Sequence, residues 1–267
     1  MTTDQGELTD QGDPADWGGS AGWREPADGG NMTLLEHLLE LRTRVTWMAG
    51  AVAAASFVFF LPPIGFRLIA VLLEPARVAV DDPDWTPIFI EPLENIVTFF
   101  QVGLLGGVSV AMPVIVYHAL RFVSPALTRS ERLWVLPIAI GASISFLLGL
   151  AFAYWVVLPL TLNFLLTFGD EFAEPELRIG NYINFVTRLL LVLGLVFETP
   201  LVVMGLAKLG AVSAGQLLRR WRIAVVGAFL ISAIVTPTID PVTQSLVAGP
   251  MVLLYFVGIG LAWLVRR

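Results

Sequence analysis

The sequence predicts an all-α membrane protein with six transmembrane helices, and three observations support this fold class. Hydrophobic residues make up 56% of the 267-residue chain, charged residues only 14%, and the mean hydropathy is +0.78. The apolar residues gather in six long runs that are separated by polar segments. Such runs are typical of transmembrane helices, because a helix needs about 20 apolar residues to cross roughly 30 Å of hydrocarbon.

The first 31 residues differ from the rest of the chain in composition. They contain seven acidic residues and one arginine among many glycines, and they lack the basic and apolar regions of a signal peptide. A segment of this composition cannot bury enough apolar surface to fold. We therefore predict a disordered acidic tail over residues 1–31 and a single transmembrane domain over residues 32–267.

A short amphipathic helix is predicted at Met32–Val45, before the first apolar run. Thr33 and Glu36 have the spacing of a capping box, and leucines recur at helical spacing to form one apolar face. We expect this helix to lie at the membrane surface. Glu40 and Arg44 are four residues apart, in the order that favours an ion pair on a helix, and such a pair explains Glu40 without any ligand.

Six predicted spans follow in order, several of them kinked by proline. Their ranges are residues 46–66, 94–120, 133–160, 182–207, 223–235 and 242–265. The prolines, each of which removes a backbone hydrogen bond, are Pro113, Pro137, Pro159, Pro200 and Pro250. The fifth range has thirteen residues, or about 20 Å of helix. It crosses a bilayer only if the membrane thins there or neighbouring helices shield its end.

Basic residues mark one side of the predicted bundle. Most of the 16 lysines and arginines lie in the N-terminal helix, in the links 121–132 and 208–222, and at the C-terminus, whereas acidic residues gather in the alternate segments. Short loops rich in positive charge stay on the cytoplasmic side of a membrane. We therefore expect a multi-pass protein of the cytoplasmic membrane with both termini in the cytoplasm.

Polar residues inside the spans are candidates for function. Glu198 lies deep in the fourth span, where a carboxylate is costly and usually functional, although a satisfied structural glutamate is the alternative. Glu94 and Gln101 should share one face at the start of the second span, either as a helix cap or as part of a site. Asp240 either caps the sixth helix or forms a recognition group at the outer rim.

The sequence has no arrangement that is typical of an enzyme. It contains no cysteine, which excludes disulfides, Cys-ligated zinc and thiol catalysis. Its two histidines, His37 and His118, do not form an HExxH motif, and neither GxSxG nor a GxxxxGK[ST] phosphate loop occurs. We expect no enzymatic activity, no cofactor or metal, and no nucleic-acid partner.

Several short motifs occur in a fixed order along the chain. They are His37-Leu-Leu-Glu40-Leu-Arg42-Thr-Arg44, Pro75, Pro92-Leu-Glu94, Ala111-Met-Pro113-Val-Ile-Val-Tyr117, Phe122-Val-Ser-Pro125-Ala-Leu with Glu131-Arg132, Phe197-Glu198-Thr-Pro200, Arg219-Arg220, and Thr236-Pro237 with Asp240 and Gln244. In this order and spacing, from about Met32 to the C-terminus, the chain resembles the TatC family. That family is the multispanning receptor subunit of the twin-arginine (Sec-independent) protein translocase.

The resemblance implies a function and a set of site residues. A member of this family binds twin-arginine signal peptides at its cytoplasmic face. With single-span subunits of the TatA/TatB type, as an oligomer in the active complex, it exports folded proteins across the lipid bilayer. The implied signal-peptide contacts are Glu40, Glu131, Arg42, Arg132 and Phe122. The implied intramembrane or partner-subunit residues are Glu198, Glu94 and Gln101, and the outer-rim residues are Pro75, Asp240 and Gln244.

The chain departs from the family pattern in three places, and other function classes stay open. Thr128 stands where an aromatic residue is frequent, Gln101 where lysine is frequent, and a Pro-Pro-Asp motif is loosened to Pro237-Thr-Ile-Asp240. A small ion-coupled secondary transporter that uses Glu198 is the alternative, although the two halves of the chain show no convincing repeat. An intramembrane hydrolase would need a nucleophile–base pair that is not evident.

Overall fold

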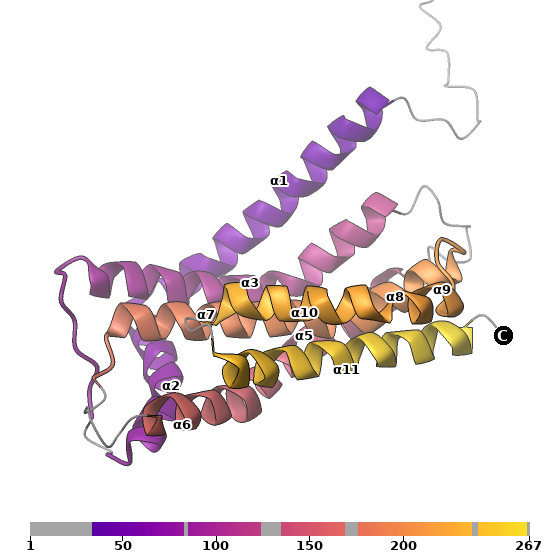
Figure 1. Cartoon of the computed structure of the whole chain (residues 1–267). Coiled ribbons are helices and arrows are strands. Elements are labelled where there is room, and N and C mark those ends of the chain that lie inside the picture. Colours follow the sequence, from indigo (N-terminus) through magenta and orange to yellow (C-terminus); the bar gives the residue numbers. More distant parts are fainter. Residues whose placement is uncertain (1–33, 83–84, 124–134, 169–175, 237–239, 266–267) are drawn as a thin grey trace, which may run out of the picture.

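The computed structural model describes residues 34–82, 85–123, 135–168, 176–236 and 240–265. In these ranges the chain is helical apart from short connections and one β-bridge between Ile88 and Arg178, so the predicted all-α fold is confirmed. The helices, labelled in Figure 1, are α1 (Leu34–Phe59), α2 (Pro62–Val80), α3 (Glu94–Val123), α5 (Val135–Phe152), the π-helical turn η2 (Ala153–Val157), α6 (Leu158–Thr167), α7 (Ile179–Phe197), α8 (Thr199–Lys208), α9 (Ala214–Arg219), α10 (Trp221–Val235) and α11 (Pro241–Val265).

Four helical stretches in the described part of the chain are long and apolar enough to cross a membrane. They are Glu94–Phe122, Val135–Thr167, Ile179–Lys208 and Pro241–Val265, and they contain most of the second, third, fourth and sixth predicted spans. The fifth predicted span lies in the shorter α10. In Figure 1, α7, α10 and α11 run alongside one another, while the first half of α1 stands away from the bundle.

The first span differs from the prediction at both ends. α1 is one continuous helix, so no break separates the predicted interfacial helix at 32–45 from the span that follows. At its other end α1 stops at Phe59 and not at Phe66. Pro62 and Pro63 cause this early stop, because proline cannot donate the hydrogen bond that would continue α1 but is favoured at the start of a new helix. That new helix, α2, is bent by 89° from α1.

The segment after Phe66, predicted as a wet connection because of its acidic residues, is mostly the helix α2. Leu72, Leu73 and Ala76 are buried on one side of α2, and Glu74 is exposed on the other. The apolar residues have the spacing of a helix, which is the signal that the acidic residues obscured. α2 packs against α6 and α3.

α1 and α3 approach each other closely through small residues. A Cβ atom added at Gly107 would lie 2.7 Å from the Cα atom of Ser56, so only glycine fits there. Closer to the C-terminal end of α3, the ring of Trp47 in α1 stacks on the ring of His118 in α3, with 6.4 Å between the ring centroids. Residue numbers therefore rise along α1 as they fall along α3, which defines an antiparallel pair.

α7 lies at the centre of the core. Its buried side contributes Ile183, Val186, Leu189 and Leu193, and it contacts α5, α3, α10 and α11. Because lipid is as apolar as these side chains, close packing and not removal from water holds such helices together. A Cβ atom at Gly149 of α5 would lie only 2.8 Å from Gly194 of α7, which shows how closely the two backbones approach.

We expect Gly107→Ala to lower the free energy of unfolding by about 1–3 kcal/mol, because the new methyl group overlaps the backbone of α1. The matched control is Gly141→Ala in α5, where a Cβ atom meets nothing within 4 Å. Both changes give the same gain in helix propensity. Denaturant titration in detergent micelles measures the difference, and equal stabilities of the two variants would contradict the α1–α3 packing.

Candidate functional site

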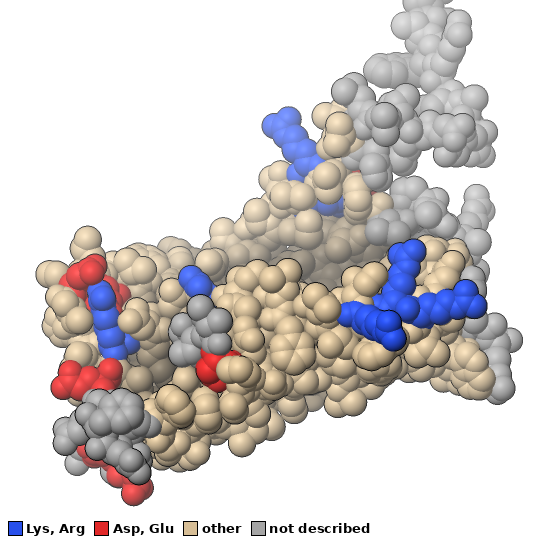
Figure 2. All heavy atoms as spheres, in the orientation of Figure 1, with Lys and Arg blue, Asp and Glu red and all other residues tan. Residues whose placement is uncertain are grey.

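Charged residues gather at opposite ends of the molecule. Lys208, Arg219, Arg220 and Arg222 lie around α8, α9 and the start of α10, at what we call the basic end. Glu91, Glu94 and Arg178 lie at the other end, which we call the acidic end. Figure 2 shows the two groups of side chains far apart along the molecule. The predicted sites divide between these ends and the bundle interior.

Glu40 lies in the first half of α1. Arg44 donates a hydrogen bond from Nη2 to Glu40 Oε1 at 2.9 Å, and the two side chains are 21% and 19% exposed for Glu40 and Arg44 respectively. The predicted ion pair is therefore confirmed. Arg42 is exposed beside it, as are Leu38 and Leu41. This part of α1 is thus open on both its charged and its apolar sides.

The end of α3 lies level with Glu40. The pairs Ser56–Gly107 and Trp47–His118 set the antiparallel register of α1 and α3. Glu40 lies two helical turns before Trp47 in α1, and two turns after His118 lead to the end of α3. Phe122 is half-buried there. Glu131 and Arg132, the other predicted contacts, lie outside the described residues.

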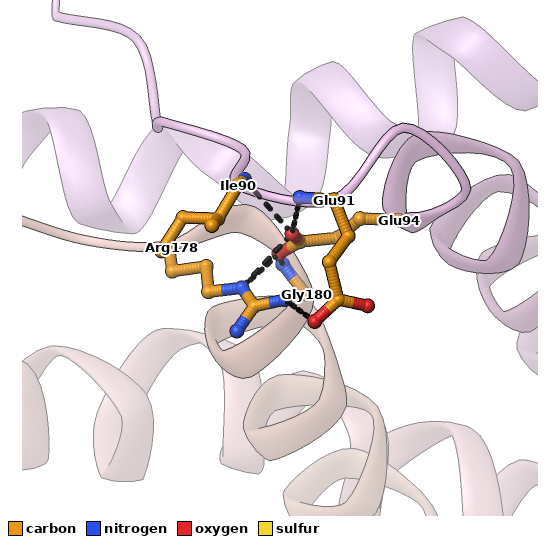
Figure 3. Close-up of polar contacts among 5 residues, drawn as sticks. All are labelled: Ile90, Glu91, Glu94, Arg178 and Gly180. Carbon is orange, nitrogen blue, oxygen red and sulfur yellow. Dashed lines mark hydrogen bonds and ion pairs between the residues drawn. The ribbon is translucent and has the colours of Figure 1, made fainter.

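Glu94 is the centre of a hydrogen-bonded cluster at the acidic end (Figure 3). Arg178 Nε donates to both carboxylate oxygens at 2.9 Å, and the Gly180 N–H donates to Oε1 at 2.7 Å. The N–H groups of Ile90 and Glu91 donate to Oε2 at 3.2 and 3.4 Å. The Glu94 side chain is only 6% exposed. Glu94 therefore does not cap the first turn of α3, as one interpretation had it, but joins the connection before α3 to the start of α7. The carboxylate is fully used within the chain.

Arg178 joins two segments that are far apart in sequence. It also donates from Nη2 to Glu91 Oε1 at 2.9 Å. Hydrogen bonds to Glu94, and then to Glu91, raise the pKa of the Arg178 guanidinium above its ordinary value, so the cluster stays ionised. Next to it, the β-bridge between Ile88 and Arg178 aligns the two connections. A Cβ atom at Gly180 would lie 2.6 Å from Glu94 Oε1, so glycine is required for this contact.

An open cavity of about 250 Å³, lined by both polar and apolar residues, lies beside this cluster between α3 and α7. Glu94 and Gln101 both line it, which confirms that they share a face of α3. Gln101 Nε2 donates to Asn184 Oδ1 of α7 at 3.4 Å. Thr98 also lines the cavity, and its buried Oγ1 makes no hydrogen bond within the described part of the chain.

Glu198 lies at the junction of α7 and α8, and it is 9% exposed. Pro200 near the start of α8 explains the break. Within the described ranges, Glu198 Oε1 is buried without a hydrogen-bond partner. A carboxylate oxygen in this state needs a donor from outside the described residues or a proton of its own.

The residues predicted at the outer rim lie in three different settings. Asp240 Oδ1 accepts a hydrogen bond from the Thr243 N–H at 2.6 Å, which confirms its role as the cap of α11. The Gln244 carbonyl accepts from Ser232 Oγ at 2.9 Å and so ties α11 to α10. Pro75, which the predicted spans leave in the segment between the first and second span, is buried inside the helix α2.

Pro75 lies inside a helix at an acceptable cost because its neighbours compensate. Proline has no N–H to donate to the carbonyl four residues earlier, which belongs to Val71. The hydroxyl of Tyr154 donates to that Val71 carbonyl at 2.7 Å.

The described residues contain no group of three or more His, Cys, Asp or Glu that could hold a metal ion.

Comparison with known proteins now assigns the family. A family model described as Sec-independent protein translocase protein (TatC) matches residues 36–250. The chain belongs to the TatC family. It is 37% identical over 241 residues to the Sec-independent protein translocase protein TatC of Synechocystis sp., a match that covers 88% of this chain and 90% of that protein.

Other matches in the TatC family agree with this assignment. The chloroplastic Sec-independent protein translocase protein TATC of Arabidopsis thaliana is 38% identical over 245 residues, covering 91% of this chain and 68% of that protein. A crystal structure of a twin-arginine translocase receptor, TatC, superimposes with a TM-score of 0.78 at 36% identity, covering 87% of this chain and 100% of that one. Membership of a translocase family disfavours the secondary-transporter alternative.

We expect Glu94→Gln to lower the melting temperature of the detergent-solubilised chain. Glutamine has nearly the shape of glutamate, but an amide nitrogen in place of Glu94 Oε1 cannot accept the hydrogen bonds that Arg178 and Gly180 donate to that oxygen. Glu91→Gln is the matched control, because Glu91 is 71% exposed and makes one bond to the same arginine. If both variants melt at the same temperature, the acidic-end cluster does not stabilise the fold.

Proposed function

We propose that this chain is the signal-peptide receptor subunit of a twin-arginine translocase and acts in the export of folded proteins. The observation that carries the proposal is the match of residues 36–250 to the TatC family, together with the likeness at 36% identity to a solved receptor of that translocase. We further propose that it lies in the cytoplasmic membrane with the basic end and both termini in the cytoplasm, as positive charge in short loops requires.

Glu40 and Glu131 are the proposed ligands of the two signal-peptide arginines. A guanidinium is always charged and offers a planar fork of donors that pairs bidentately with a carboxylate. Two adjacent arginines need two carboxylates on separate supports. α1 provides one support, and the segment that follows α3 provides the other, starting level with Glu40 in the α1–α3 register.

The ion pair with Arg44 determines how the Glu40 carboxylate is presented. Arg44 orients the Glu40 carboxylate at 2.9 Å, and an incoming arginine exchanges one guanidinium for another. A lysine supplies the charge but not the fork, so it replaces Arg44 less well. Arg42, Arg132 and Phe122 are proposed to support the same surface.

Glu198 is proposed to receive the single-span subunits of the TatA/TatB type. Its buried Oε1 has no donor among the described residues, and a polar group on a neighbouring transmembrane helix would satisfy it. Because such subunits would bind from the membrane, we propose that the active complex is an oligomer. Gln101 is less suited to this contact, because its side-chain amide already donates a hydrogen bond to Asn184 within the chain.

We expect Glu40→Ala and Glu131→Ala each to reduce photocross-linking to a twin-arginine signal peptide about tenfold or more, since each removes a hydrogen-bonded charge partner. A peptide with Lys-Lys in place of Arg-Arg should cross-link less well to the unmodified chain. Glu36→Ala, one turn before Glu40 on α1, is the matched control and should cross-link normally. Unchanged cross-linking in both Glu40 and Glu131 variants would remove these residues from the site.

We expect Glu198→Ala to reduce co-purification with the single-span subunits while signal-peptide cross-linking at Glu40 persists. The reason is that the substitution removes the only unsatisfied carboxylate oxygen in the described bundle interior. Leu195→Ala, an exposed position one turn earlier in α7, controls for lost packing. Full recovery of the partner subunits by the Glu198 variant would contradict the assignment.

A further inference from the structure

Arg188 is an exposed cation on the central helix of the bundle. α7 buries most of its circumference, but Asn181, Arg188 and Leu195 are exposed along one stripe, with Asn184 half-buried beside them. The half of this stripe nearer the acidic end is polar, and the other half is apolar. An amphipathic stripe on a lipid-spanning helix needs an occupant of matching polarity.

The position of Arg188 is deep within an apolar span. It lies nine residues after Ile179, the first residue of α7, which is about 13 Å along the helix axis. The span Ile179–Lys208 is one of those long and apolar enough to cross a membrane. A guanidinium at this depth is costly unless an anion or water reaches it.

The described part of the chain does not provide that anion. No ion pair or hydrogen bond of Arg188 occurs among the described residues. Glu91 and Glu94, the acidic-end carboxylates of the α3–α7 contact, are both paired with Arg178. Glu198 is ten residues further along, about 15 Å down the axis and on the other side of Arg188 from the acidic end.

A polar path leads from the acidic end towards Arg188. Asn181 and Asn184 line the cavity of about 250 Å³ between α3 and α7, and Gln101 completes its polar wall. Arg188 follows Asn184 by one helical turn on the same exposed stripe. Water and a polar headgroup can therefore approach Arg188 along Asn181 and Asn184 of α7.

A neighbouring helix, α10, is shorter than the hydrocarbon layer of a bilayer. α10 contacts α7 and has 15 residues, about 22 Å of helix against roughly 30 Å of hydrocarbon. In Figure 1, α10 and α11 stop short of the ends of α3 and α7 on the acidic side. Their ends carry the polar residues Thr236 and Asp240. A lipid headgroup that contacted these ends would lie deeper than one at the ends of α3 and α7.

We propose that Arg188 binds the phosphate of a lipid headgroup from the leaflet at the acidic end, drawn inwards beside α7 where α10 ends. A guanidinium fork matches the oxygens of a phosphate, and the amides of Asn181 and Asn184 add polar contacts above it. A carboxylate on a partner helix fits less well, since its apolar residues would then lie against Asn181 and Asn184. This inference goes beyond the proposed receptor function and does not depend on it.

The test is native mass spectrometry of the full chain in detergent, titrated with phosphatidylglycerol. We expect Arg188→Leu to weaken lipid retention about fivefold, as loss of one lipid-binding charge predicts. Arg188→Lys should retain part of the binding. Arg67→Leu, which removes an exposed arginine of α2, should leave retention unchanged. A leucine at a lipid-facing position should not impair folding, and an unchanged elution profile on gel filtration would verify this.

Four outcomes would overturn the proposal. The first is equal retention of lipid by Arg188→Leu and the unmodified chain, and the second is equal loss in Arg188→Leu and Arg67→Leu. The third is that Arg188→Leu leaves lipid retention intact but loses single-span subunits on co-purification, which would identify a carboxylate on a partner helix as the occupant. Soluble glycerol phosphate should not displace the lipid; displacement would indicate a general phosphate site and not a membrane one.

Discussion

The ion pair between Glu94 and Arg178 is the contact on which the arrangement of the bundle depends. It joins the first residue of α3 to the residue before α7, although 84 positions separate them in the chain. α1 packs on α3, and α5, α10 and α11 contact α7, so fixing these two helices fixes the positions of the others. Low exposure of Glu94 and its four hydrogen-bond donors explain why the connection is specific and not only electrostatic.

Close backbone contacts between α1 and α3 fix the positions of residues at the opposite end of the bundle. The fit of Gly107 against Ser56 sets the register of α1 on α3, and this register brings Glu40 level with the end of α3. A shift by one turn would move Glu40 by about 5 Å and separate it from the segment that carries Glu131. The fit of Gly107 in the middle of α3 therefore determines the geometry of the proposed peptide-binding surface.

Sequence patterns predicted the features that depend on local chemistry. The Glu40–Arg44 pair and the Asp240 cap are each formed within four residues, and the long apolar runs required helices whatever their packing. The early end of α1 was missed although its cause, Pro62 and Pro63, is local. The burial of Pro75 was missed because it depends on partners elsewhere, such as the Tyr154 hydroxyl. No local signal identifies Arg178 as the partner of Glu94, and only the folded chain shows that Arg188 faces outwards.

The span Ile179–Lys208 contains two ionisable residues of opposite sign, Arg188 and Glu198, that cannot pair with each other. Arg188 and Glu198 are about 15 Å apart along the axis, and Glu198 is buried while Arg188 is exposed. At that separation their direct attraction does not offset the cost of removing either from water. Arg188 therefore needs an external partner, and Glu198 needs either an external partner or a proton. A translocase subunit that binds both lipid and other subunits through its central helix would have this property, whereas a self-contained helical bundle would pair such charges internally.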